Sequence, residues 1–267
     1  MQAREGTAII DLESLRPEES YSACMSDAEL AYLGASRMQA QRQQSLGARL
    51  CLKHLFLQQM ACNISDRFIP IHSDDLNRFP AWLYREVSAS QNPKTAAPAL
   101  KWCGTRLPNL SVSLSHSGTL CCASLASARG IGVDLESATA RTPEFYRAYF
   151  SAEERGWVAA NSVAIDAAWL FTILWSLKEC AFKAARGEEW AFTDLAAIEV
   201  VGFPELADVN AAYESSQLML EPSRFQVAMS SHQRIDWFDC ELGGNRDHVV
   251  VVARRSTTRG RIRHHDT

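Results

Sequence analysis

The sequence predicts a fold of the α+β class, and three features of the 267-residue chain support this prediction. Apolar residues recur at helical spacing across about 27–60 and again across 167–186. Apolar and polar residues alternate across 111–136, as they do in half-buried strands. Four further short strand-like runs are expected to form a second sheet, and they lie at 196–201, 224–229, 233–238 and 247–253.

The composition is that of an ordinary soluble globular protein, because 47% of the residues are hydrophobic and 22% are charged. A net charge of −4 argues against general binding to nucleic acid. No apolar run approaches the roughly 20 residues that cross a bilayer, and the N-terminus lacks the basic-then-apolar order of a secretory signal. The sequence therefore predicts a cytoplasmic protein that has neither a nucleic acid nor a membrane as its partner.

The eight cysteines are scattered along the chain, and no two of them form a C-x-x-C pair. A disulfide framework or a zinc site is therefore not expected. Most of the cysteines are predicted to be small core residues.

The helical segment that begins near residue 27 is predicted to contain one or two helices, the second over about 36–59. Arg42, Arg49 and Lys53 stand at i, i+7 and i+11 in this second helix, which gathers them into one basic stripe. The ordinary explanation for such a stripe is a solvated face. Four prolines in the following region, 63–108, predict loop or short irregular structure.

Residues 111–136 are predicted to form an antiparallel meander of three strands, separated at 117–119 and at 127–130. In the first strand, Ser115 and the neighbouring alternate serines share one face, and His116 lies on the other. His116 ends the strand, where a ring can lean into a cleft, although a lone histidine there more often satisfies the turn.

The third strand of this meander, IGVDLE at 131–136, carries Asp134 and Glu136 on the same face. At that spacing the two carboxylates lie roughly 7 Å apart along the strand, which is unfavourable in a partly buried site unless a cation lies between them. The alternative is an edge strand with one wet face, which carries such a pair at little cost.

Two helices are predicted after this strand. Ser151 and Glu154 form a capping box that opens the first, so Glu154 is assigned a structural role. The second helix, 167–186, carries Glu179, Lys183 and Arg186 as a narrow charged seam on an otherwise apolar surface. An ion pair on the solvent side is the alternative explanation for this seam.

Taken together, two or three carboxylates without a cysteine or histidine set are typical ligands of a hard cation, most often magnesium. Magnesium held by few protein ligands usually takes phosphate oxygens from a substrate, and basic groups meet the remaining charge. The residues therefore favour a metal-assisted reaction on a phosphate or pyrophosphate ester.

Two segments resemble, in order, the signature motifs of the Sfp-type 4′-phosphopantetheinyl transferases. The segment IGVDLE at 131–136 resembles (V/I)-G-(V/I)-D-x-E, and WSLKECAFK at 175–183 resembles (F/W)-(S/C/T)-x-K-E-(A/S)-x-x-K. SLSHS at 113–117 is similar to a third family strand, and RQQSLGAR at 42–49 to its upstream helix. The resemblance covers most of 37–190.

The resemblance implies a role for each matching position. Asp134, Glu136 and Glu179 would hold Mg²⁺, which would explain the two like charges on one strand. Glu179 would accept the proton of the attacking serine, directly or through a metal-bound water, and Lys183 would contact the phosphates and stabilise the leaving group. The residues that would contact coenzyme A are Arg42, Arg49, Lys101, Ser115, His116 and Lys183, with Arg49 alternatively serving its own helix.

The same resemblance implies a transferase that moves 4′-phosphopantetheine from coenzyme A to a serine of an apo acyl or peptidyl carrier protein, releasing 3′,5′-ADP. Its fold would be two similar α+β halves related by a pseudo-twofold axis, with coenzyme A in the cleft between them and a monomeric chain. The halves would be 1–125 and 126–253, the second carrying the metal motifs. Independently of the resemblance, the arginines at 254–267 and the lack of apolar periodicity there predict a basic, disordered tail. The carrier would come from fatty acid, polyketide or nonribosomal peptide synthesis.

Three departures from the family pattern bear on these expectations. Cys180 replaces a small Ala or Ser of the family motif. RGEEW at 186–190 replaces the family's glycine-rich continuation, so the rim of the coenzyme A pocket is expected to differ from that of the family. Lys178 belongs to the motif but projects about 100° from Glu179, so we expect it behind the metal ligands or facing the carrier. The alternatives are a non-catalytic coenzyme A-binding protein of the same fold, and an unrelated magnesium-dependent phosphoesterase.

Overall fold

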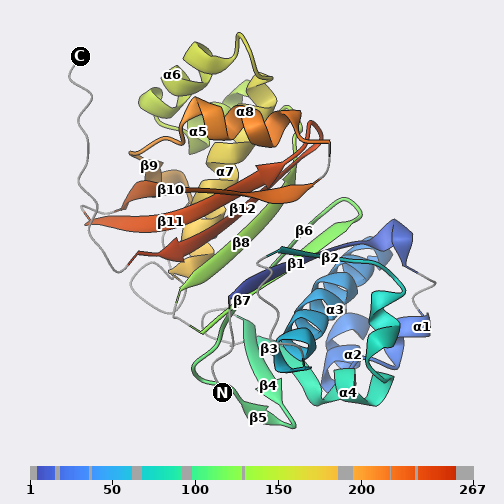
Figure 1. Cartoon of the computed structure of the whole chain (residues 1–267). Helices are drawn as coiled ribbons and strands as arrows, with labels where there is room; N and C mark the ends of the chain where they lie inside the picture. Colours follow the sequence, from blue (N-terminus) through green and yellow to red (C-terminus); the bar gives the residue numbers. More distant parts are fainter. Residues whose placement is uncertain are drawn as a thin grey trace. The chain divides into compact units, whose positions relative to one another are not determined.

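The computed structural model describes residues 5–15, 19–35, 38–61, 68–91, 98–127, 130–185, 195–216, 218–231 and 234–256. The chain divides into an N-terminal unit, Met1–Leu135, and a C-terminal unit, Glu136–Thr267. The boundary falls within the strand β8 (Ile131–Ser137), whose residues are shared between them (Figure 1). The fold is of the α+β class, as the sequence predicts, and each unit combines a sheet with helices.

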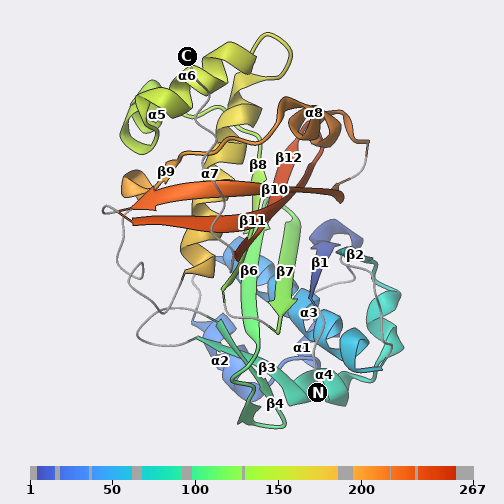
Figure 2. The same ribbon diagram turned by 60° about the vertical axis from the view of Figure 1, so that its left-hand side comes forward.

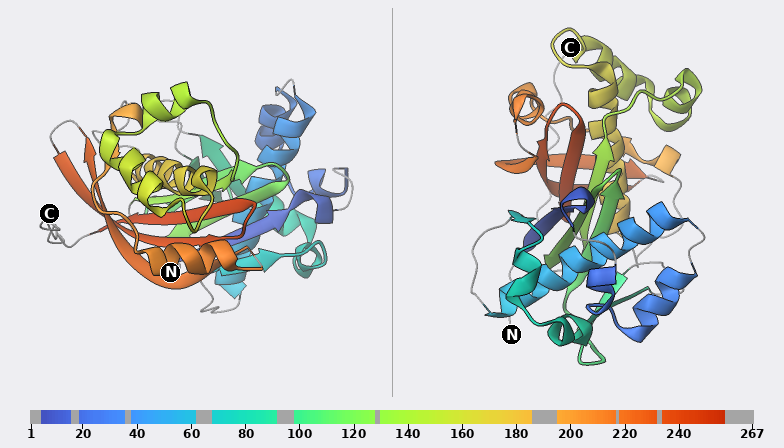
Figure 3. Two further views of the ribbon diagram at one scale, coloured as in Figure 1. Left: turned by 90° about the horizontal axis from the view of Figure 1, so that it is seen from above. Right: turned by 90° about the vertical axis from the view of Figure 1, so that its right-hand side faces the viewer.

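The N-terminal unit is built on a four-stranded sheet in the order β2-β1-β7-β6. β1 pairs in parallel with β2 and antiparallel with β7, and β7 pairs antiparallel with β6. The long helix α3 lies along this sheet (Figure 3). The bounds of these elements are β1 Gly6–Asp11, η1 Leu12–Ser14, α1 Glu19–Ser22, α2 Asp27–Gly34, α3 Gln39–Ala61, β2 Phe68–Ile71, β6 Ser111–Ser117 and β7 Leu120–Ala126.

The helix α3 is buried from Leu46 to Gln58, so the predicted solvated basic stripe is wrong. Lys53 is fully buried and Arg49 nearly so, because carboxylate and carbonyl oxygens of the unit surround Lys53. The helix also approaches the sheet closely at Gly47, where a Cβ atom would lie 2.5 Å from Leu12 Cδ2 and 2.8 Å from Cys121 Sγ. A side chain at residue 47 would therefore require the Leu12 and Cys121 side chains to move.

The region 63–108 is more regular than its prolines indicate. It contains a three-stranded antiparallel sheet in the order β3-β4-β5, so the prediction of loop or irregular structure is wrong there. Val87 and Leu100 are fully buried and anchor the sheet to the core of the N-terminal unit. The elements are η2 Asp75–Arg78, α4 Ala81–Glu86, β3 Val87–Gln91, β4 Pro98–Trp102 and β5 Thr105–Arg106.

The C-terminal unit contains the second sheet that the sequence predicts. The sheet has the order β8-β12-β11-β10-β9, and helix α7 packs across it (Figure 2). Trp169, Leu170 and Leu177 of α7 share one buried core with Phe238 and Val251 of the sheet. The elements are α5 Pro143–Tyr149, α6 Ala152–Asn161, α7 Ala167–Ala184, η4 Leu195–Ala197, β9 Glu199–Val200, α8 Leu206–Glu214, β10 Met219–Ser231, β11 Arg234–Gly244 and β12 His248–Arg255.

The predicted three-stranded meander is correct for its first two strands and wrong for the third. β6 and β7 form the expected hairpin, with Ser115 opposite Cys122 and His116 opposite Cys121. β7, however, takes β1 as its second neighbour, and β8 belongs to the five-stranded sheet beside β12. Hydroxyl groups of β6 serines accept hydrogen bonds from the backbone N–H groups of Val133 and Leu135 in β8. Because these N–H groups bond to side chains and not to backbone carbonyls of β6, β8 does not extend the hairpin.

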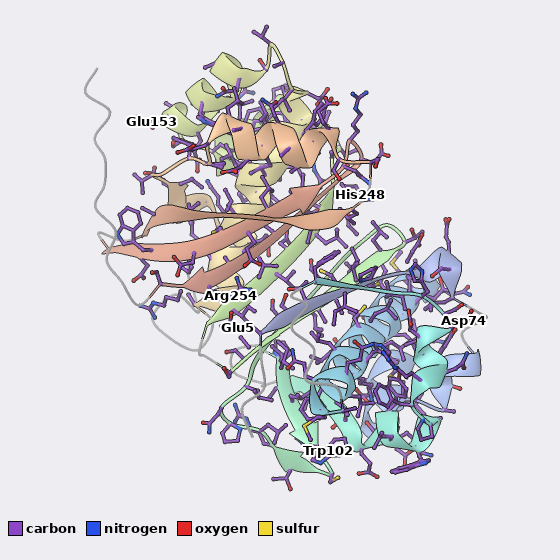
Figure 4. The ribbon with its side chains drawn as sticks, viewed as in Figure 1. Glu5, Asp74, Trp102, Glu153, His248 and Arg254 are labelled. Carbon is purple, nitrogen blue, oxygen red and sulfur yellow. The ribbon has the colours of Figure 1, made fainter. Side chains whose placement is uncertain are left out.

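Two sequence expectations concern the chain's end and its cysteines. Arg254 (labelled in Figure 4) and Arg255 belong to β12 rather than to a tail, because they form ion pairs with Glu241 and Asp236 of β11, each at 3.2 Å. Residues 257–267 lie outside the described residues.

The cysteines among the described residues are all free, and Cys103 alone among these is exposed. No helix in the described part of the chain is long and apolar enough to cross a membrane.

A buried polar network in the N-terminal unit makes stability depend on pH. His54 is fully buried, with Nδ1 2.7 Å from the Tyr84 hydroxyl and Nε2 2.6 Å from Gln58 Nε2. Burial lowers the pKa of His54 from 6.5 to about 4. Since the unfolded chain then binds the proton more readily than the folded one, the free energy of unfolding should fall as pH drops from 6.5 towards 4. Urea unfolding at several pH values tests this, and His54→Gln should flatten the dependence; an equal slope in the variant would contradict the assignment.

Candidate functional site

Asp134 lies in the middle of β8 and is held by the neighbouring strand β6. It is only 2% exposed, and its Oδ1 accepts a hydrogen bond of 3.0 Å from the Ser115 hydroxyl. The same hydroxyl accepts the backbone N–H of Leu135 at 3.2 Å, and Ser113 accepts that of Val133 at 3.0 Å. The serine face of β6 therefore fixes the backbone of β8 and one oxygen of Asp134.

Glu136, two residues further along β8, is partly exposed and faces a small aromatic pocket. Its Oε2 lies 3.7 Å from an Arg141 nitrogen, and the Arg141 guanidinium also lies over the Phe145 ring, 5.7 Å from its centroid. The pocket is lined by Glu136, Thr139, Arg141, Phe145, Tyr146, Phe150, Phe171, Thr172 and Trp175. Glu136 thus lies beside the face of α7 that carries Trp175.

Helix α7 presents one half-exposed stripe on a surface that is otherwise buried from Trp169 onward. The stripe consists of Phe171, Trp175, Glu179, Phe182 and Lys183. Glu179 lies one helical turn after Trp175, and its Oε2 is 3.6 Å from Lys183 Nζ. The ion pair between Glu179 and Lys183 that the alternative explanation of the charged seam expects is therefore present. Arg186, the third member of the predicted seam, lies outside the described residues.

Lys178 points the other way and is fully buried, which excludes a position facing a carrier. Its ammonium group lies 2.8 Å from Glu154 Oε2 and also donates to the carbonyl of Tyr149. Burial lowers the pKa of Lys178, and the charge of Glu154 opposes this effect. Glu154 closes the predicted capping box with Ser151, so its structural role is confirmed.

The three carboxylates predicted to hold a metal supply only oxygen donors, which fits a hard cation such as Mg²⁺. Asp134 and Glu136 share β8, and Glu136 lines a pocket with Trp175, which lies one helical turn before Glu179 on α7. Across the described ranges, no three His, Cys, Asp or Glu side chains are gathered into a preformed metal cluster.

A comparison with protein-family models matches residues 130–229 to the 4′-phosphopantetheinyl transferase superfamily. Residues 130–229 form a domain of this superfamily. The domain includes Asp134, Glu136, Glu179 and Lys183, so both of the sequence motifs that carry the resemblance fall within it. A comparison with curated proteins found no match.

Apart from Lys183, the residues predicted to contact coenzyme A lie upstream of residues 130–229, in the N-terminal unit. His116 is exposed at the end of β6, and Lys101 is half-buried on β4. Arg42 is half-buried on α3, and its Nε atom has no hydrogen-bond partner among the described residues. Binding of an anionic ligand by these three side chains stays a prediction.

Ser115 and Arg49 have contacts within the unit that the sequence does not reveal. Ser115 is buried against β8, where its hydroxyl bonds to Asp134. Arg49 is 5% exposed, donates to the carbonyl of Ser45 at 3.0 Å and lies over the Tyr32 ring at 4.6 Å. Arg49 therefore supports its own helix, as the alternative interpretation expects.

Sequence reasoning missed Arg141, which lies close to Glu136. Its position in a polar stretch before α5 gave no periodic signal, although its spacing of five residues from Glu136 keeps it near the strand end. Sequence reasoning also missed the buried partners of Lys53 and Lys178. A lysine within a run of apolar residues, as in SLKECAF and RLCLKHLF, is the signal that could have revealed both.

Proposed function

We propose that this chain transfers 4′-phosphopantetheine from coenzyme A to a serine hydroxyl of an apo carrier protein, releasing 3′,5′-ADP. The observation that carries this proposal is the Glu179–Lys183 pair on the half-exposed stripe of α7, within a domain of the transferase superfamily. A carboxylate beside an ammonium group provides a proton acceptor and a cation for phosphate oxygens in one place.

In the proposed reaction, the serine oxygen of the carrier forms a bond to the β-phosphorus of coenzyme A. The bond between that phosphorus and the bridging oxygen breaks, and the oxygen leaves with 3′,5′-ADP. Glu179 accepts the serine proton, directly or through one water, as the bond forms. Lys183, held 3.6 Å from Glu179, neutralises the negative charge that develops on the phosphate oxygens.

Magnesium, when bound, would supply Lewis-acid neutralisation of the pyrophosphate, and Asp134, Glu136 and Glu179 are the residues that would hold it. Ser115 orients Asp134 for this purpose through its 3.0 Å hydrogen bond. Arg141 balances the charge of Glu136 until the cation is present. Arg42, Lys101 and His116, the last in its charged form, are proposed to meet the nucleotide phosphates of coenzyme A.

Ser115→Ala should weaken metal binding more than it weakens the fold. The variant leaves the N–H of Leu135 without its hydroxyl acceptor and releases Asp134 Oδ1, so we expect a loss of about 1–3 kcal/mol in unfolding free energy. Mn²⁺ affinity, measured by titration calorimetry, should fall roughly 10- to 100-fold.

Ser113→Ala is the matched control, because Ser113 makes the same kind of bond to the N–H of Val133 but none to Asp134 that the structure records. It should lose comparable stability and keep its Mn²⁺ affinity. Equal affinity losses in both variants would contradict the role of Ser115 in orienting Asp134.

The transfer reaction is tested by intact-mass spectrometry of apo carrier proteins from fatty acid, polyketide and nonribosomal peptide synthesis. Each is incubated with the protein, coenzyme A and Mg²⁺, with EDTA as the control. A gain of one phosphopantetheine mass that EDTA abolishes is expected. Coenzyme A binding without any mass gain would indicate a binding protein, and coenzyme A hydrolysis without an acceptor would indicate a phosphoesterase.

A further inference from the structure

The two units contain the same buried arrangement of a serine, a glutamate and a lysine. In the N-terminal unit these are Ser26, Glu29 and Lys53, and in the C-terminal unit they are Ser151, Glu154 and Lys178. In both units the glutamate follows the serine N-cap by three residues and precedes the lysine by 24. We call each glutamate–lysine pair a clamp.

The clamp of the C-terminal unit joins four elements. Glu154 Oε2 accepts the Lys178 ammonium at 2.8 Å and the Ser151 N–H at 2.8 Å, which links α7 to the start of α6. Glu154 Oε1 accepts the N–H of Val200 in β9 at 2.9 Å. Lys178 also donates to the carbonyl of Tyr149, the last residue of α5.

The clamp of the N-terminal unit repeats each of these contacts, and Lys53 also donates to the carbonyls of Tyr84 and Val87. Glu29 Oε2 accepts Lys53 at 2.8 Å and the Ser26 N–H at 3.0 Å, and Glu29 Oε1 accepts the N–H of Ala89 in β3 at 3.2 Å. Lys53 donates to the carbonyl of Cys24 at 3.0 Å. Cys24 precedes its N-cap serine by two residues, as Tyr149 does, so the correspondence extends to the backbone acceptor.

The units differ in the residues that come after the clamp lysine. In the N-terminal unit, His54 and Gln58 stand at i+1 and i+5 and are buried against each other and Tyr84. In the C-terminal unit the same two positions hold Glu179 and Lys183, on the half-exposed stripe of α7. One clamp therefore precedes a buried polar network and the other precedes the proposed reactive pair.

Stability alone does not explain why a charged pair is buried in α7. Replacing a buried ion pair by apolar groups of similar size is often neutral or stabilising, so such a pair contributes more to a unique arrangement than to the free energy of folding. Through Glu154, Tyr149 and Val200, the clamp ties Lys178 to α5, α6 and β9, and these contacts restrain the rotation and the axial position of α7. Since neighbouring residues project about 100° apart, a fixed Lys178 determines where Glu179 points.

We propose that Lys178 and Glu154 are positioning residues that hold α7 so that Glu179 and Lys183 are correctly placed for metal binding and phosphoryl transfer. This inference rests on the proposed function of Glu179 and adds the ion pair that orients the Glu179 side chain. A displacement of the reacting groups by about 1 Å can cost on the order of a hundredfold in rate, so loss of the clamp should lower kcat more than it raises KM.

The test compares Lys178→Met combined with Glu154→Gln against the matched pair Lys53→Met combined with Glu29→Gln. Each double variant removes both charges of a clamp and keeps an amide oxygen for one of the two backbone N–H groups that the glutamate accepts. The C-terminal variant should lose about tenfold or more in kcat and in Mn²⁺ affinity, and hydrogen exchange of the α7 amides should accelerate. The N-terminal variant should stay within about twofold of the parent in both measurements.

Wild-type kcat and Mn²⁺ affinity in the C-terminal variant would overturn the proposal, and so would equal losses in the two variants. If the C-terminal double variant does not fold, Glu154→Gln and Glu29→Gln alone give the same comparison. If the parent protein transfers nothing to any carrier, the proposed function fails, but the Mn²⁺ affinities still decide whether the clamp orients Glu179.

Discussion

Glu179→Gln is expected to lower the single-turnover rate of phosphopantetheine transfer by roughly a thousandfold or more. The substitution keeps the shape of the side chain but removes the proton acceptor, for which a contribution of about 10² to 10⁴ is usual. It also removes the charge that faces Lys183 at 3.6 Å and one of the proposed metal ligands. Rapid-quench mixing with saturating coenzyme A and carrier measures this rate without interference from product release.

Glu153→Gln is the control for this variant. Glu153 (labelled in Figure 4) is an exposed carboxylate on α6 in the same unit, so its loss should leave the rate unchanged. A Glu179→Gln rate within a fewfold of the parent, with the fold intact, would show that this carboxylate neither accepts the proton nor holds the metal.

Asp134→Asn should reduce turnover by several orders of magnitude through loss of the metal. Asp134 is 2% exposed and held by Ser115, so an asparagine of the same size fits the site but lacks the charge that a divalent cation requires. Calorimetric titration with Mn²⁺ should show binding weakened beyond the concentrations at which the parent saturates, and added Mg²⁺ should restore part of the activity.

Asp27→Asn provides the comparison, because the Asp27 side chain is 91% exposed and pairs only with Arg85 among the contacts that the structure records. This variant should bind Mn²⁺ as the parent does. Unchanged Mn²⁺ affinity in Asp134→Asn would mean that the acidic strand serves packing and not a cation.

Much of the C-terminal unit could be predicted from the sequence, because its signals are local. The capping box at Ser151, the apolar period of α7 and the alternation of β10 to β12 each arise within a few residues. The half-exposed stripe of α7 is consistent with the same period, since Glu179 and Lys183 interrupt it at i and i+4. The ion pair between these two residues, which was the alternative explanation for the charged seam, therefore follows from their local spacing.

The errors concern contacts between residues far apart in sequence. The charge of Lys53 normally indicates a solvent-exposed position, but this lysine forms a buried ion pair with Glu29. No local sequence pattern shows that the two residues are close in space. The third strand of the meander leaves its hairpin because serine hydroxyls of β6 replace carbonyls as acceptors of β8. Similarly, the sheet β3-β4-β5 forms across a proline-containing segment because Val87 and Leu100 pack into the hydrophobic core of the N-terminal unit.

Phosphopantetheine transfer is tested most directly by measuring 3′,5′-ADP and modified carrier in the same reaction by liquid chromatography and mass spectrometry. The protein, coenzyme A, Mg²⁺ and an apo carrier should yield the two products in a one-to-one ratio, with neither product formed when EDTA is present. Formation of 3′,5′-ADP without modified carrier, or of neither product with every class of carrier, would contradict the proposed transfer.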